Sequence, residues 1–147
     1  MNSKGLAVIV LAAGKGTRMK SSLAKVLQPL KNKPLLYYVL ESLAPLNPDL
    51  SVLVVGFQSK VVKESFSDRG LIFVEQKEQL GTGHAAQQAK LALHDFSGDV
   101  LVVCGDMPLI KSQTLIDLVN RHREKKSACT VLTLKSSEKK DFGLVVR

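Results

Sequence analysis

Apolar residues along the chain follow two alternating patterns. The first is a short, nearly continuous apolar run, typical of a strand buried on both faces, and it occurs at residues 6–11, 51–55, 71–74, 100–104 and 129–134. The second is an apolar spacing of three and four, which predicts helices over residues 35–43, 59–66, 84–93 and 113–123. Pro34 opens the first of these helices, and Pro45 and Pro48 end it. The alternation predicts a three-layer, Rossmann-like α/β fold with a mainly parallel sheet covered on both faces.

The length of 147 residues corresponds to one domain, and 45% apolar with 23% charged residues is typical of a soluble globular protein. No apolar run approaches the ~20 residues that a membrane-spanning helix needs. The sequence ends in the apolar, strand-like run 143–147. We therefore expect the chain to be a fragment of a longer protein, and a terminal edge strand is the alternative.

The net charge of +8 is concentrated near the N-terminus, where seven lysines and arginines precede the first acid, Glu41. Such a stretch attracts an anion. No aromatic residues are interleaved with these charges for base stacking, so a phosphorylated small molecule is favoured over nucleic acid. A solvated basic face is the alternative.

Two cysteines, Cys104 and Cys129, lie inside apolar runs, and we expect both to be buried thiols in a reducing compartment. Residues 1–13 resemble a signal peptide, but residues 14–20 contain three basic residues where a cleavage site should be uncharged. We therefore expect a cytoplasmic protein.

The loop after the first predicted strand is rich in small residues, which let backbone N–H groups approach a ligand closely. With Arg18 and Lys25 nearby, this loop predicts a cradle for a triphosphate. It is neither a Walker A loop nor a dinucleotide fingerprint, because glycines are missing at Ile9 and Met19. A simple tight turn is the alternative. The cradle residues are Leu11, Ala12, Ala13, Gly14 and Gly16.

A second glycine-bearing loop, residues 81–86, matches the looser dinucleotide pattern. Residues 76–80 separate it from its strand, which argues against a nicotinamide or flavin site. We expect Thr82 to cap the following helix beside the ligand. The amides of Gln76 and Gln79 suit the edge of a uracil or cytosine ring, with an ordinary surface position as the alternative.

Asp106 follows Gly105 at the end of the fourth predicted strand. A carboxylate at this edge is suited to Mg²⁺, which takes one or two carboxylates plus phosphate oxygens, and a helix cap is the alternative. The three histidines, His84, His94 and His122, have no metal-ligand spacing and no companion nucleophile. We assign none of them a role in nucleophilic catalysis.

Residues 11–19, with the stretch 25–27 that follows them, and residues 78–85 and 105–109 together resemble the motifs of the sugar-phosphate nucleotidyltransferases. The second segment is similar, more narrowly, to the N-terminal uridyltransferase domains of the bacterial bifunctional N-acetylglucosamine-1-phosphate uridyltransferase/glucosamine-1-phosphate acetyltransferases. The resemblance implies transfer of UMP from UTP to N-acetylglucosamine 1-phosphate, which yields UDP-N-acetylglucosamine for the cell wall and pyrophosphate. The alternatives are a cytidylyl- or guanylyltransferase of the same superfamily, or a truncated nucleotide-binding module without turnover.

The resemblance also implies residue roles. The nucleotide would be held by Leu11 to Gly14, Gly16, Gly81, Thr82 and Gly105. Gln76 would bind the uracil, and Arg18 and Lys25 would bind the phosphates. Asp106 would bind the Mg²⁺, and Gly143 would contact the acceptor. Three positions depart from the family pattern: Ala24 stands for a proline, Cys104 for a tyrosine and Leu144 for an arginine. These departures bear on the identity of the substrates. The resemblance also implies that residues 1–147 form the N-terminal, nucleotide-binding part of the nucleotidyltransferase domain, without its later acceptor-binding region and without the acetyltransferase domain.

Overall fold

The computed structural model describes residues 5–16 and 21–134, which form an α/β fold around a four-stranded parallel sheet. The strand order is β5-β4-β1-β6. These strands are β1 (Gly5–Ala12), β4 (Leu50–Val55), β5 (Ile72–Glu75) and β6 (Gly98–Cys104). A small antiparallel hairpin pairs β2 (Pro29–Leu30) with β3 (Lys33–Pro34). The α-helices are α1 (Leu35–Leu43), α2 (Ser59–Ser65), α3 (Thr82–Gln88) and α4 (Ser112–Lys125), and the 3₁₀ helices are η2 (Lys25–Leu27), η3 (Ala44–Leu46) and η4 (Ser67–Arg69).

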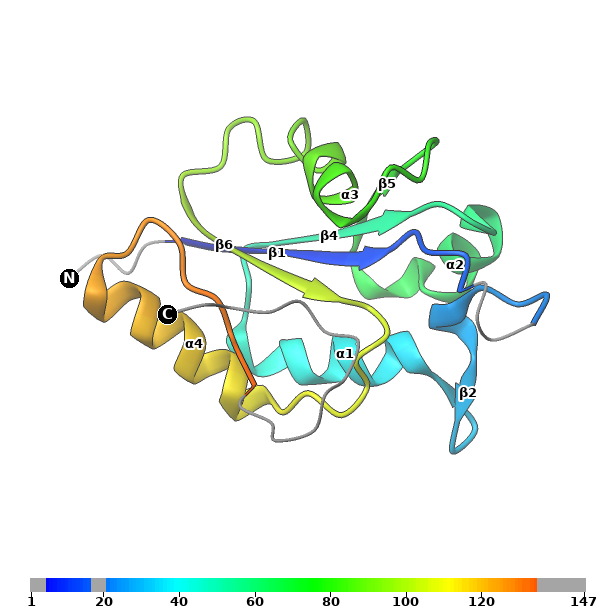
Figure 1. Ribbon diagram of the computed structural model, residues 1–147, viewed down its shortest axis with the longest axis horizontal. Coiled ribbons are helices and arrows are strands. Elements are labelled where there is room, and N and C mark those ends of the chain that lie inside the picture. Colours follow the sequence, from blue (N-terminus) through cyan, green and yellow to red (C-terminus); the bar gives the residue numbers. More distant parts are fainter. Residues whose placement is uncertain (1–4, 17–20, 135–147) are drawn as a thin grey trace.

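The central strands β1 and β4 are buried on both faces because helices cover both sides of the sheet, as Figure 1 shows for α3 on one side and α1 and α4 on the other. The expectation of burial on both faces is wrong for β6, where Val100 and Val102 are exposed. Successive residues of β1 point to opposite layers. Val8 and Val10 belong to the larger core with α1, α2 and α4, whereas Ile9 packs in the smaller core with α3. The predicted three-layer fold with a parallel sheet is confirmed.

The central strand β1 fixes the edge at which the glycine-bearing loops meet. Its residue Leu11 lies opposite Cys104 of β6, and Ala12 lies opposite Val55 of β4. All these pairings are parallel, so the loops that follow β1, β4 and β6 leave the sheet at one edge. Open α/β sheets bind ligands at this carboxyl edge.

The prediction of a fifth strand at residues 129–134 is wrong. This segment forms no ladder with any described strand, and Val131 and Leu134 are exposed. An apolar run becomes a strand only where a neighbouring strand accepts and donates its backbone hydrogen bonds, and periodicity does not reveal that partner. The expectation of two buried thiols is corrected with it, because Cys129 is exposed and Cys104 is half-buried.

Two predicted features of the helix after the second glycine-bearing loop also need correction. Helix α3 ends at Gln88 rather than near Leu93, and tighter turns follow, in which Ala89 N donates to Ala86 O at 3.1 Å. Thr82 does not cap the helix, because Gly81 occupies the N-cap position and no side chain bonds there. The predicted strand at 143–147 lies outside the described residues.

No helix within residues 5–16 and 21–134 combines the length and the apolar character needed to cross a bilayer.

Candidate functional site

A cleft of about 290 Å³ opens at the carboxyl edge of the sheet and gathers most of the predicted site residues. It is bounded by the loop after β1, the start of η2, the loop before α3 and the end of β6. Ten of the predicted residues line it: Leu11, Ala12, Ala13, Gly14, Lys25, Gln76, Gln79, Gly81, Thr82 and Asp106.

Close packing explains the glycine at the end of the first loop. Gly16 has a φ of +68°, which side-chain-bearing residues adopt reluctantly. A Cβ built on Gly16 would lie 2.7 Å from the Cβ of Lys25. The loop therefore passes directly against the backbone that carries the predicted phosphate-binding lysine.

The backbone position of Lys25 is fixed by the residues on either side of it. Ala24, Val26 and Leu27 are buried in the larger core, which anchors η2 on both sides of Lys25. Gln58 adds a clamp, because its Oε1 accepts a hydrogen bond from Ala24 N at 2.7 Å and its Nε2 donates to the Ser22 carbonyl at 2.9 Å. Sequence reasoning missed Gln58, which lies far from the motif along the chain.

The end of β6 brings a carboxylate to this lysine. Lys25 Nζ forms an ion pair with Asp106 Oδ2, and the two side chains are 40% and 29% exposed. Asp106 does not cap a helix, because α4 begins later, at Ser112 with Lys111 at its N-cap. Among the described residues, the cleft thus presents a cation and an anion that neutralise each other and face the same space.

The donor set suits a divalent cation held jointly with phosphate. The described residues contain no group of three or more histidine, cysteine or acidic side chains that could enclose a metal. Mg²⁺ is ordinarily bound by one or two carboxylates plus substrate phosphates, so a single carboxylate beside a phosphate cradle fits it. Asp106 is the described residue that would hold the ion.

Cys104 lines the cleft and is half-buried. Burial, together with the nearby Asp106 carboxylate, raises the pKa of the Cys104 thiol above its ordinary value, and Lys25 opposes this effect. Cys104 therefore remains a neutral thiol at neutral pH, which argues against a nucleophilic role.

The second glycine-bearing loop supplies two amides. Gln76 is buried, and Gln79 donates from Nε2 to the carbonyl of Ala13 at 3.0 Å. This bond ties the second loop to the first, a role that the sequence does not reveal. Gly81 has a φ of +100°, so the turn into α3 requires glycine.

Four predicted residues do not line the described cleft. Gly16 lies behind Lys25, and Gly105 is buried with its N–H donating to the Leu11 carbonyl at 2.8 Å. Both glycines therefore position the loops and do not form the surface of the cleft. Arg18 and Gly143 lie outside the described residues.

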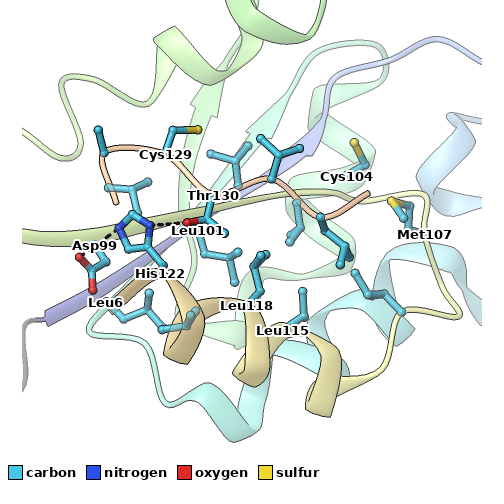
Figure 2. Close-up of a pocket in the computed structure, with 18 residues that line it drawn as sticks. Leu6, Asp99, Leu101, Cys104, Met107, Leu115, Leu118, His122, Cys129 and Thr130 are labelled. Carbon is cyan, nitrogen blue, oxygen red and sulfur yellow. Dashed lines mark hydrogen bonds and ion pairs between the residues drawn. The ribbon is translucent and has the colours of Figure 1, made fainter. Parts of the chain in front are cut away.

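A larger cavity of about 460 Å³ lies elsewhere, along β6 and α4 (Figure 2). Its walls are mostly apolar, with a polar end where His122 Nδ1 bonds Thr130 Oγ1 at 3.0 Å. Below we call it the β6 groove. Cys104 is the residue it shares with the cleft, and none of the predicted site residues lines it.

A parallel α/β sheet with two small-residue loops, a lysine and a carboxylate around one cleft is the arrangement of a nucleotide-binding enzyme domain. Residues 8–141 match the model of the MobA-like NTP transferase domain. The chain belongs to this nucleotidyltransferase family.

The curated relatives point within that family to one group. The chain is 50% identical over 141 residues to the bifunctional protein GlmU of Synechococcus elongatus, which covers 95% of this chain and 31% of that protein. It is 43% identical to the bifunctional protein GlmU of Desulfotalea psychrophila, covering 96% of this chain and 42% of the relative. The chain is thus similar to the N-terminal region of GlmU and spans 31% to 42% of the length of these two relatives.

Solved structures agree on the fold. The Rv0371c complex with manganese from Mycobacterium tuberculosis aligns with a TM-score of 0.61 and 20% identity, covering 79% of this chain and 58% of that one. A fold match at this identity establishes the architecture.

Proposed function

We propose that this domain transfers UMP from UTP to a sugar 1-phosphate, specifically N-acetylglucosamine 1-phosphate, and releases pyrophosphate. The observation that carries the proposal is the cleft itself, where both small-residue loops meet Lys25 and Asp106. The similarity to GlmU proteins over almost the whole chain supports the uridylyl form of the reaction.

The proposed reaction is a displacement at phosphorus. An oxygen of the acceptor's phosphate forms a bond to the α-phosphorus of UTP, and the bond from that phosphorus to the bridging oxygen of pyrophosphate breaks. The attacking phosphate oxygen is already ionised, so the protein needs no general base. Positioning and charge neutralisation then account for the rate.

Each described residue has a part in this proposal. Leu11 and Ala12 line the nucleotide site, the backbone N–H groups of Ala13 and Gly14 beyond β1 approach the phosphates, and Lys25 neutralises charge that develops on the departing pyrophosphate. Asp106 would hold Mg²⁺, which supplies charge neutralisation between the nucleotide phosphates. Phosphate and metal would each take one partner of the present Lys25–Asp106 pair. Arg18 remains a predicted phosphate ligand and Gly143 a predicted acceptor residue.

The proposed reaction also determines the partners and the location that we propose. UTP and the sugar phosphate are the proposed small-molecule partners, without nucleic acid or membrane, and the cytoplasm is the proposed location because it contains both substrates. We also propose that residues 1–147 form the nucleotide-binding part of a larger domain.

Calorimetric titration with UTP, CTP, GTP and dTTP in the presence of Mg²⁺ tests the nucleotide. We expect UTP to bind most tightly. A clear preference for CTP or GTP would favour the cytidylyl or guanylyl alternative.

A pyrophosphate-release assay with UTP and either N-acetylglucosamine 1-phosphate or glucose 1-phosphate tests the reaction and the acceptor. It should be run on this chain and on any longer natural form. UTP binding without pyrophosphate release in either form would identify a binding module rather than an enzyme.

A further inference from the structure

The buried amide of Gln76 has a fixed environment. Its residue follows β5, and its backbone N–H donates to the Val55 carbonyl at 2.8 Å, which extends the sheet ladder by one bond. The side chain is among the few buried polar groups of the described chain. Its Nε2 donates to the Gly81 carbonyl at 3.2 Å and lies 2.9 Å from Nδ1 of His84.

These two contacts use both hydrogens of the Gln76 amide nitrogen. What the amide offers to the cleft is therefore its carbonyl oxygen, Oε1. No described residue is recorded as donating to Oε1, and no fully buried side-chain nitrogen or oxygen in the described chain lacks a partner. Oε1 is thus open to the cleft as a hydrogen-bond acceptor.

The ring of His84 determines whether this orientation persists. Its Nδ1 faces the amide of Gln76, and its Nε2 lies 3.0 Å from the amide nitrogen of Gln88. A neutral imidazole carries one N–H, so only one ring nitrogen accepts. Each amide nitrogen also donates to a backbone carbonyl at 3.2 Å, Gln76 to Gly81 and Gln88 to His84. The two differ in burial, since Gln76 is buried and fixed in place, whereas Gln88 is half-buried and has room to turn its own carbonyl oxygen toward the ring. The consistent assignment has Nδ1 accepting from Gln76 and Nε2 carrying the proton.

We propose that His84 is a positioning residue for base selection. Its neutral Nε2–H form holds Gln76 so that Oε1 faces the cleft. This inference rests on the proposed uridylyltransferase function and extends it. An acceptor at this place pairs with the ring N3–H of uracil and opposes the bare N3 of cytosine, which is itself an acceptor.

The opposite amide orientation shows why the histidine matters. Turning Gln76 over would place Oε1 against the Gly81 carbonyl oxygen, which repels it, and would present Nε2 to the cleft. A donor there suits cytosine instead. Removing the acceptor at His84 removes one of the two contacts that prevent this rotation.

Two substitutions separate orientation from packing. His84→Leu keeps an apolar side chain of similar size but has no acceptor, whereas Oδ1 of His84→Asn can accept near the position of Nδ1. We expect His84→Leu to lower the ratio of UTP to CTP affinity about tenfold, as loss of one oriented hydrogen bond implies. His84→Asn should retain most of the ratio. The matched control His94→Leu, at a side chain 77% exposed, should leave the ratio unchanged.

Calorimetric titration with UTP and with CTP in the presence of Mg²⁺ gives these ratios. A His84→Leu variant with the wild-type ratio, or a His84→Asn variant that loses as much as His84→Leu, would overturn the inference. Wild-type binding that favours CTP would instead overturn the proposed function, so the two failures are distinguishable.

A measurement on the wild-type chain covers the case in which His84→Leu does not fold. Long-range ¹H–¹⁵N NMR spectra distinguish protonated from bare ring nitrogens, and the His84→Asn variant assigns the signals. We expect His84 to have a bare Nδ1 and a protonated Nε2 without nucleotide. A protonated Nδ1 at neutral pH would contradict the proposed orientation whatever the nucleotide preference.

Discussion

The cleft and the β6 groove adjoin the same strand but are built in opposite ways. The cleft is smaller, and its loops are tied together by hydrogen bonds such as Gln79 to Ala13 and Gln58 to Ala24. The β6 groove is larger and mostly apolar, and its wall is the packing surface of α4. The size of a cavity is thus a poor guide to chemistry here, because only the smaller one combines charges with backbone groups that suit phosphate.

This contrast predicts two classes of variant. Substitutions in the wall of the β6 groove should change the free energy of unfolding and leave nucleotide affinity alone. Substitutions in the cleft should lower nucleotide affinity or turnover and leave the free energy of unfolding nearly unchanged.

The largest expected effect is on stability. Leu115 on α4 is fully buried where the core meets the β6 groove, so Leu115→Ala should lower the free energy of unfolding by about 2 to 5 kcal/mol. Urea denaturation measures this change. Leu91→Ala, at a site 85% exposed, is the matched control and should stay within about 0.5 kcal/mol of wild type. UTP affinity of the folded Leu115→Ala chain should be unchanged, and a large loss of affinity would contradict the separation of the two regions.

The next effect is on the chemical step. Asp106→Asn removes the carboxylate that would hold Mg²⁺, and Lys25→Ala removes the cation that would meet the phosphates. We expect either change to lower pyrophosphate release by an active form at least roughly a hundredfold, as loss of one preorganised electrostatic contact implies. Circular dichroism and the melting temperature should change little. Asp117→Asn, on the exposed face of α4, removes a similar charge and should leave activity unaltered.

An unfolded Asp106→Asn chain would identify Asp106 as a structural residue. The metal assignment would also be wrong if the variant folded and bound UTP with unchanged Mg²⁺ dependence.

A smaller effect tests the clamp that holds Lys25. Gln58→Leu removes the acceptor for Ala24 N–H and the donor to Ser22, which should loosen the segment before Lys25. We expect turnover to fall about tenfold while the melting temperature changes by a few degrees. Gln113→Leu, at an exposed side chain of α4, is the control. Unchanged turnover in Gln58→Leu would show that buried Val26 and Leu27 alone hold Lys25.

The sequence predicted the sheet well because buried parallel strands and amphipathic helices have distinct periods. It failed at residues 129–134, where the apolar run is real but no described strand pairs with it. Glycine and charge motifs predicted the cleft because small residues, Lys25 and Asp106 are adjacent to strand ends. Three contacts were not predicted: those of Gln58 with Ala24, of Gln79 with Ala13 and of His84 with Gln76. Periodicity and motif spacing do not show which side chains meet in the folded chain.

The smallest effect uses the residue that the two regions share. Cys104 lines both cavities, and burial with the Asp106 carboxylate raises the pKa of its thiol, whereas Cys129 is exposed. Iodoacetamide reacts with the thiolate, so it should label Cys129 first at neutral pH and Cys104 only as the pH rises. Mass spectrometry of the labelled chain, with Cys129→Ser to isolate Cys104, measures both rates.

The neighbouring charges predict the sign of the change in this labelling. Asp106→Asn removes a contribution that raises the pKa of Cys104, so its labelling profile should move to lower pH. Lys25→Ala removes a contribution that lowers that pKa, so its profile should move to higher pH. UTP with Mg²⁺ should slow the labelling of Cys104 and leave Cys129 unaffected. Protection of Cys129 instead would place the nucleotide in the β6 groove and reverse the assignment of the two cavities.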